Sequence, residues 1–351
     1  MLKRTFMKVL LAGTMIAGAG FSASHAEMVA WDGPTAGPKA ADSKTIVYLG
    51  ADMKNGGVLG VANGVEEAAE KAGWKFRALD GAGTVSGRAA IFGQAMALKP
   101  DGIILGGLDL AEQQTAVKTA IDAGIPLVSW HTGTHIGCDA PGGIFANVST
   151  DAMAVSEAAA EWAVTDAGGK PAVVIFTDST YQIASDKADR IKETIEKMGG
   201  TVLEYVDTPI ADTSARMGPL TTSLLQKYGA KWTHALAIND LYFDFMGPAL
   251  AAAGIAGDGS PKAGSAGDGS EAAFQRIRTN QYQTITVAEP LNLQGWQLVD
   301  ELNRAIQGET CSGYITSPAL VTQEGLKAMG DSNQFDPQSP YREAYATIWG
   351  K

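Results

Sequence analysis

The sequence is poor in the residues from which most metal and nucleophilic centres are built. It contains four histidines and two cysteines in 351 residues. His131 and His135 have the spacing of two metal ligands on a helix, but Gly133 and two threonines lie between them and indicate a loop. Cys138 and Cys311 belong to no C-x-x-C pair. We therefore expect neither a metal site nor any other cofactor.

Motifs of catalysis and of nucleotide binding are missing as well. The sequence has no P-loop, no G-x-G-x-x-G after a strand and no G-x-S-x-G elbow. An exported carbohydrate-active enzyme would need two carboxylates placed as acid and base, and the sequence places no such pair. That class remains an alternative, and we expect the protein not to be an enzyme.

Basic residues are scarce: 27 Lys and Arg stand against 38 Asp and Glu. Three of the basic residues lie in the first eight positions, before a stretch of small apolar residues over 9–20. Ser24-His25-Ala26 follows and resembles a signal-peptidase site. The stretch is shorter than the roughly 20 residues that span a bilayer, and no cysteine follows it to carry a lipid. We expect residues 1–26 to be a cleaved signal peptide and the protein to reside in the periplasm.

Removal of that peptide leaves 24 basic residues against 38 acidic ones, a net charge of −14. Such a charge argues against a nucleic-acid partner, whose phosphates need Lys and Arg. The remaining 325 residues exceed what one hydrophobic core usually supports, which favours two domains. In an oxidising compartment Cys138 and Cys311 could form a disulfide or remain two free thiols, and the sequence leaves both possibilities open.

Apolar strand-like runs alternate with helix-like segments at a spacing of about 25 residues, which predicts parallel sheets with right-handed crossovers. This alternation is interrupted over 131–148 and then resumes. We expect an α/β protein with two Rossmann-like parallel-sheet lobes joined by three crossovers, near residues 147, 289 and 313. The predicted divisions are a flexible arm (27–44), an N-terminal lobe (45–147 plus 290–312) and a C-terminal lobe (148–289 plus 313–351).

Residues 234–254 carry the most informative pattern. A buried strand over 235–238 ends in Asn239-Asp240, and helical spacing then runs from Leu241 to Gly254. Ligands of open α/β sheets bind beyond the carboxyl ends of the strands, and Asn and Asp are suited to bind a hydroxylated ligand. The alternative is that both residues cap the helix. We expect Asn239 to contact a ligand and Asp240 to cap.

Other polar residues follow predicted strands in the same way: Asn55, His131, Asn147, Asp268 and Glu289. Trp130 ends a strand beside His131, and its ring could pack on the apolar face of a sugar or simply belong to the core. If the strand ends meet at one cleft, these side chains meet there too.

Four motifs over residues 45–325 resemble one family. They are Ala237-Ile238-Asn239-Asp240 with Gly247 and Gly254, the run 124–128 (GIPLV), Gly267-Asp268-Gly269, and Ala288-Glu289-Pro290 with Gln294-Gly295. In these motifs the chain resembles the type I periplasmic binding proteins of ABC sugar importers, the ribose- and galactose-binding group. The resemblance implies the type I periplasmic binding protein fold, with a ligand cleft between the lobes.

The resemblance also implies sugar contacts at Asn239, Asp268 and Glu289, near Asn55, and at the strand end Trp130-His131. Two departures stand out. Ribose-like members have Asp-Arg where this chain has His131-Thr132, and their second-lobe Arg is absent, with Ser185 or Lys187 nearby. The missing Arg, together with Glu289 where ribose-like members more often have Gln, predicts a more acidic cleft, which disfavours an anionic ligand.

The function implied is that of a monomer which captures a sugar or polyol and delivers it to an inner-membrane ABC permease. Presentation of the ligand to a chemoreceptor or sensor kinase is the alternative. Repressors with the same core carry an N-terminal DNA-binding helix pair, and here a signal peptide and a Gly/Pro-rich arm take its place.

Overall fold

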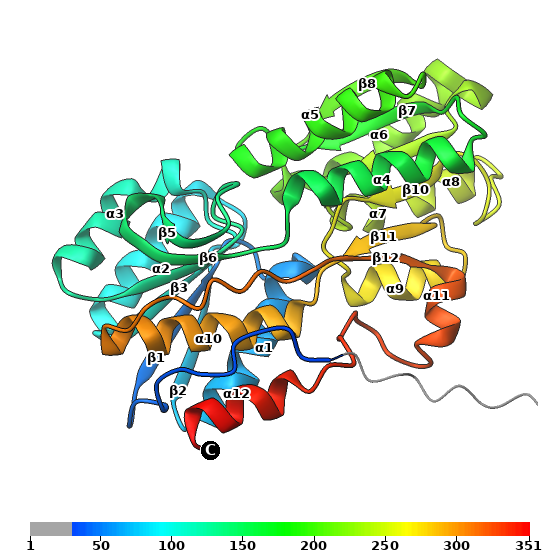
Figure 1. The fold of residues 1–351 in the computed structure, drawn as a ribbon. Helices are drawn as coiled ribbons and strands as arrows, with labels where there is room; N and C mark the ends of the chain where they lie inside the picture. Colours follow the sequence, from blue (N-terminus) through cyan, green and yellow to red (C-terminus); the bar gives the residue numbers. More distant parts are fainter. Residues whose placement is uncertain (1–29) are drawn as a thin grey trace, which may run out of the picture.

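The computed structural model describes residues 30–351, so the predicted signal peptide lies outside the described residues. The chain forms two lobes, each built around a six-stranded sheet with helices on both faces (Figure 1). The predicted fold class is confirmed. Within the described residues no helix combines the length and the apolar character that crossing a bilayer would require.

The sheet of the N-terminal lobe has the order β2-β1-β3-β4-β6-β5, parallel except for the pair β5–β6. Its strands are β1 (Thr45–Gly50), β2 (Lys75–Asp80), β3 (Gly102–Gly106), β4 (Leu127–Trp130), β5 (Gly137–Ala140) and β6 (Ile144–Val148). Its helices are α1 (Gly56–Ala72), α2 (Val85–Leu98), α3 (Leu110–Asp122), α10 (Leu291–Gln307) and α12 (Tyr341–Trp349), with a 3-10 turn at Pro141–Gly143.

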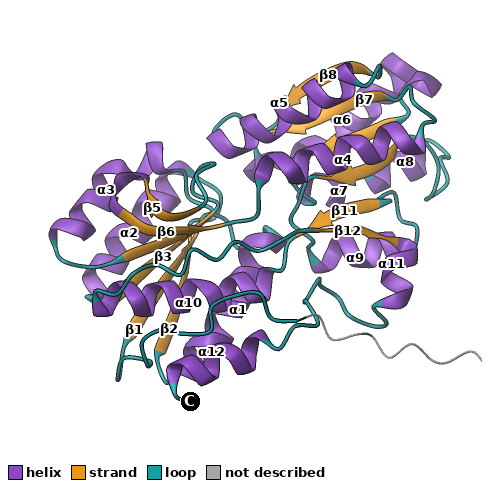
Figure 2. Cartoon of the chain, viewed as in Figure 1, coloured by secondary structure: helices purple, strands orange, loops and turns teal. Residues whose placement is uncertain are grey.

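The sheet of the C-terminal lobe has the order β12-β11-β10-β9-β7-β8, with β12 antiparallel to β11. Figure 2 shows the strands of this lobe between layers of helices. Its strands are β7 (Ala172–Thr177), β8 (Thr201–Asp207), β9 (His234–Ala237), β10 (Lys262–Ser265), β11 (Ile285–Ala288) and β12 (Ala319–Thr322). Its helices are α4 (Ala152–Asp166), α5 (Gln182–Lys197), α6 (Thr213–Tyr228), α7 (Leu241–Asp244), α8 (Gly247–Ala252), α9 (Glu271–Arg278) and α11 (Gln323–Ala328), with 3-10 turns at Ile210–Asp212 and Gly229–Lys231.

The helix predicted over 241–254 is two short helices, α7 and α8. The break falls at Phe245-Met246, just before Pro248. Proline has no N–H to donate within a helix, but it is well tolerated in a first turn, so Pro248 starts a new helix instead of continuing the old one.

The C-terminal tail corrects the predicted lobe boundaries. The last helix, predicted over 341–349, exists as α12, but it packs on the N-terminal lobe and not on the C-terminal one. Trp349 stacks on Trp296 of α10, with ring centroids 5.4 Å apart, and its Nε1 donates to Asp300 Oδ1 at 2.8 Å. Tyr341, Tyr345 and Trp349 form one apolar face that must be buried, and its helical spacing does not reveal which lobe buries it. Besides the three predicted crossovers, a fourth connection over 329–340 therefore joins the lobes.

The arm predicted to be flexible is fixed to the N-terminal lobe over its described part. Arg304 Nη2 donates to the Ala36 carbonyl at 2.7 Å, and Asn303 Nδ2 donates to the Pro38 carbonyl at 3.1 Å. The Ala40 amide donates to the Trp349 carbonyl at 3.1 Å. Residues 30–44 thus lie against α10 and α12, because those helices offer partners to backbone groups of the arm.

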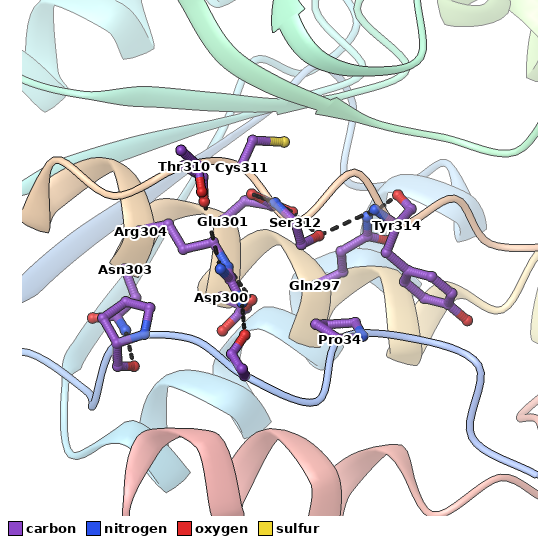
Figure 3. A network of polar contacts seen from close by, with 12 residues as sticks. Pro34, Gln297, Asp300, Glu301, Asn303, Arg304, Thr310, Cys311, Ser312 and Tyr314 are labelled. Carbon is purple, nitrogen blue, oxygen red and sulfur yellow. Dashed lines mark hydrogen bonds and ion pairs between the residues drawn. The ribbon is translucent and has the colours of Figure 1, made fainter.

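A covalent bond and a buried carboxylate hold the third crossover to the N-terminal lobe. Figure 3 shows Glu301 of α10 beside Ser312 of the crossover. Cys138 of β5 and Cys311 form a disulfide across 173 residues of sequence. The next residue, Ser312, donates its backbone N–H to Glu301 of α10 at 3.1 Å, and its hydroxyl donates to the same carboxylate. The segment is therefore anchored on two sides just before it crosses to β12.

Glu301 gives a stability prediction. Burial raises its pKa from 4.5 to about 7, so the native protein binds this proton more tightly than the unfolded chain does. The native state is consequently destabilised as pH rises from 4.5 through 7, by up to about 3 kcal/mol. We expect Glu301→Gln to leave stability near pH 4 unchanged and to raise the free energy of unfolding by about 1–3 kcal/mol at pH 8. Urea unfolding at both pH values would measure this, and an equal change at both would contradict it.

Candidate functional site

The carboxyl ends of strands from both sheets line a cleft between the lobes. It leaves about 560 Å³ of space between atoms, part of it open to solvent. The lining residues come from strand ends and from the first turns of α1 and α5: Ala51, Asp52, Asn55, Val58, Gly107, Trp130, His131, Tyr181, Ile183, Ala184, Lys187, Ile210, Ile238, Asn239 and Asp268. Five of the predicted site residues are among them, namely Asn55, Trp130, His131, Asn239 and Asp268.

Asn55 and Asn239 line the cleft, and each side chain is held by backbone amides. Asn55 caps α1, since its Oδ1 accepts from the amides of Gly57 at 2.8 Å and Val58 at 3.4 Å. Asn239 Oδ1 accepts from the Leu241 amide at 3.2 Å. In both residues the carbonyl oxygen is engaged by backbone, and the amide N–H₂ is left to donate to a ligand. Capping and ligand contact, the two alternatives for Asn239, are therefore compatible in one side chain.

Asp240 does not cap the helix, contrary to the prediction. It is buried, and its Oδ2 accepts from the amides of Gly269 at 2.8 Å and Ser270 at 2.9 Å. Its Oδ1 accepts from Gln283 Nε2 at 2.7 Å and from the Ser265 hydroxyl. Asp240 thus fixes the loop that carries Asp268.

Asp268 presents a free carboxylate to the cleft. It is 5% exposed, and no hydrogen bond from within residues 30–351 reaches that carboxylate. Burial raises its pKa to about 6, although the charges of Lys187 and His131 act in the opposite direction. A buried carboxylate without a partner is costly, so this group is suited to bind a donor that a ligand supplies.

Glu289 lies behind His131 and is not among the residues that line the cleft. His131 Nε2 lies 3.0 Å from Glu289 Oε1, and Gln294 Nε2 donates to Glu289 Oε2 at 2.9 Å. Burial would raise the pKa of Glu289, but His131 outweighs it, with help from Lys187 and Gln294, and holds the pKa at about 2. Through this contact Glu289 orients the His131 ring.

Trp130 is largely covered. The His131 ring stacks on it with centroids 3.8 Å apart and planes 8° apart. Trp130 is 2% exposed, and its Nε1 donates to Gln294 Oε1 at 2.9 Å. The structure thus combines the two alternatives for this residue, because Trp130 borders the cleft but belongs mostly to the core. His131 occupies one of the ring faces on which a ligand could have packed.

Asn147 does not reach the cleft. It is fully buried, and its Oδ1 accepts from the Ser129 hydroxyl at 2.8 Å and from the Thr132 amide at 3.1 Å, while its amide donates to the His135 carbonyl. All of its polar atoms are engaged in bracing the loop after β4. A polar residue near a strand end can brace a loop or contact a ligand, and the sequence does not separate the two.

Ser185 is also outside the cleft lining, and Lys187 is inside it. The reason is helical period: Ile183 and Lys187 are four residues apart and share one face of α5, whereas Ser185 points elsewhere. Lys187 is 4% exposed and makes no ion pair within the described part of the chain. It adds a positive charge, so the cleft is less acidic than predicted.

The two lobes touch across the mouth of the cleft. Arg88 Nη1 donates to the Tyr181 hydroxyl at 2.8 Å, and the Gln182 amide donates to Asp109 Oδ2 at 3.0 Å. Deeper in, Gly57 of α1 lies directly against Asp268. The structure is therefore a closed arrangement of the lobes. Tyr181 was not predicted, because it follows a loop and no pattern marks it.

His131, Asp268 and Glu289 have donor atoms within 4.8 Å of one another, a spacing that could hold a metal ion. The ammonium of Lys187 acts on both carboxylates and opposes a second cation. Neutral donors and acceptors of a ligand fit this mixed set of charges better.

Comparisons with known proteins agree with this geometry. Residues 28–310 match the family model described as periplasmic binding protein domain. No curated protein matches the sequence. Solved structures with the same fold include an ABC sugar transporter subunit from Rhodobacter sphaeroides 2.4.1, with 20% identity, coverage of 80% of this chain and 98% of that one, and a TM-score of 0.68.

Two others are a sugar ABC transporter from Yersinia enterocolitica subsp. enterocolitica 8081 and an ABC transporter solute binding protein from Agrobacterium vitis with bound allitol. The first is 19% identical, covers 88% of this chain and 95% of that one, and has a TM-score of 0.72. The second is 20% identical, covers 82% and 98%, and has a TM-score of 0.68. At these identities the likeness establishes the shared fold.

Proposed function

Because this chain belongs to the periplasmic binding protein family, we propose that it captures a sugar or polyol between its lobes in the periplasm and delivers it to an inner-membrane ABC permease. One observation carries the proposal: two opposite charges, Lys187 and Asp268, line a closed cleft without partners among the described residues. A hydroxyl both donates and accepts, so a polyhydroxylated ligand satisfies both. The bound allitol of one structural neighbour supports this class of ligand.

The side chains of the cleft are suited to bind a ligand and not to catalyse a reaction on it. Asn55 and Asn239 offer amide donors, Lys187 an ammonium and Asp268 an acceptor. Each hydrogen bond to a charged group contributes about 1.5–3 kcal/mol. Closure of the lobes excludes water and strengthens these bonds, and lobe motion is the usual way in which such folds retain a ligand.

The test is a thermal-shift screen of residues 27–351 against pentoses, hexoses, polyols and amino sugars, followed by calorimetry of the best ligand. A ligand that binds only the folded protein raises the melting temperature. We expect Asp268→Asn to weaken that ligand about tenfold, because it removes one charge-assisted hydrogen bond.

The matched control is Asp151→Asn. Asp151 is exposed and caps α4, and asparagine caps equally well. We expect this variant to bind like the unaltered protein. If no compound of these classes stabilises the protein, the proposed function fails. If one binds but Asp268→Asn leaves its affinity unchanged, the assignment of Asp268 fails.

A further inference from the structure

Four polar residues of the cleft lining lie near one another. His131 and Asp268 have donor atoms within 4.8 Å of each other. Asp268 lies against Gly57, two residues after Asn55, and Lys187 Nζ lies 3.1 Å from where a Cβ on Gly267 would stand. We call Asn55, His131, Lys187 and Asp268 the polar end of the cleft. It can bind several hydroxyls at once.

Another part of the lining, formed by the C-terminal lobe, is apolar. Tyr181, Ile183 and Ile210 line the cleft there, and all three belong to the hydrophobic core of that lobe or pack against it. Asp178 ties their loops together, since its Oδ2 accepts from the Ile210 amide at 2.8 Å and its Oδ1 from the Thr180 amide at 2.9 Å. We call Tyr181, Ile183 and Ile210 the apolar wall.

The polar side chains beside the apolar wall are those of Tyr181 and Asp52. The Tyr181 hydroxyl already accepts from Arg88 at 2.8 Å. Asp52 also lines the cleft; its Oδ1 accepts from the Lys54 amide at 3.0 Å, and within residues 30–351 no hydrogen bond reaches its Oδ2. The side chains of Ile183 and Ile210 themselves offer no hydrogen-bond partner, so a ligand hydroxyl packed directly against them would lose water without compensation.

We propose that the ligand is a deoxy sugar, with its hydroxyls at the polar end and its methyl group on the apolar wall. The proposal rests on the proposed function and narrows it. A fully hydroxylated hexose places a hydroxyl where these compounds have only carbon and hydrogen, and two aliphatic side chains offer that hydroxyl nothing. A methyl group in the same place is removed from water, which is favourable.

Calorimetry on matched pairs tests this: L-rhamnose with L-mannose, L-fucose with L-galactose, D-fucose with D-galactose, and 6-deoxy-D-glucose with D-glucose. We expect at least one deoxy sugar to bind tenfold or more tighter than its parent. Ile210→Thr, which puts a hydroxyl on the wall, is expected to reduce that preference below threefold. The control, Ile121→Thr on the exposed side of α3, is expected to leave it unchanged.

The outcomes separate the two proposals. If a parent sugar binds as tightly as its deoxy partner or tighter in every pair that binds, the deoxy sugar proposal is overturned and the proposed function stands. If the preference exists but Ile210→Thr leaves it intact, the apolar wall is not its source and the inference is likewise overturned. If none of these sugars and none of the compounds in the thermal-shift screen binds, both proposals fall.

Discussion

Replacing both Cys138 and Cys311 by serine is expected to lower the free energy of unfolding by about 5 kcal/mol. The disulfide closes a loop of 173 residues, and chain-entropy arguments assign about 5 kcal/mol to a loop of that length. It also joins β5, an edge strand, to the segment that follows α10. Guanidinium unfolding of the two proteins, with separate attention to a first transition from the N-terminal lobe, would measure the loss.

Reduction of the disulfide in the unaltered protein is the control for the two serine replacements. Dithiothreitol should destabilise the unaltered protein by a similar amount and should have no effect on the double serine variant. Ligand affinity should fall less than stability does, because neither cysteine lines the cleft. A loss below about 1 kcal/mol would contradict the prediction and would mean that native contacts such as Ser312 with Glu301 suffice.

Gly57→Ala is expected to weaken ligand binding by a hundredfold or more with little effect on stability. A Cβ at residue 57 would meet Asp268, and it would stand 2.6 Å from the Asp268 Cβ. Turning the carboxylate away cannot relieve that contact, so the loop after β10 would have to move. The clash exists only when the lobes are closed, and it therefore raises the free energy of closure and not that of folding.

Three measurements together check this prediction: calorimetry with the best ligand of the screen, small-angle scattering with and without that ligand, and thermal unfolding of the free protein. Gly93→Ala is the matched control, because Gly93 lies in α2 with nothing within 4 Å of its would-be Cβ. Unchanged affinity in Gly57→Ala would show that the lobes bind their ligand without this contact. A large loss of stability in the free Gly57→Ala protein would show that the clash destabilises the folded state itself and not only the closed arrangement.

The fold could be predicted because the strands and helices of both lobes are marked by period and by glycine stops. Outside that alternation, the strand β5 was not predicted and the lobe on which α12 packs was predicted wrongly. β5 is four residues long and includes Gly137, and α12 gave no sign of which lobe it covers. The division into α7 and α8 was not predicted. Pro248 causes it, because proline is disfavoured inside a helix but tolerated in the first turn of a new one.

Residues of the cleft could be predicted where one local pattern identifies them, namely a polar residue directly after a strand. Asn55, Asn239 and Asp268 follow strands, and they line the cleft. Asn147 obeys the same rule, but its neighbours use all of its hydrogen bonds. Contacts that depend on packing escaped prediction: the face of α5 selects Lys187 and leaves Ser185 out, and Glu289 serves the His131 ring.

The fourth connection between the lobes sets a mechanical limit. Phe335 packs with the C-terminal lobe and Tyr341 is buried in the N-terminal one. Six peptide steps separate these anchors, and a fully extended chain of that length reaches about 21 Å. The segment therefore limits how far Phe335 and Tyr341 can move apart when the lobes open. Lengthening or shortening this loop would change that limit without altering any residue that lines the cleft.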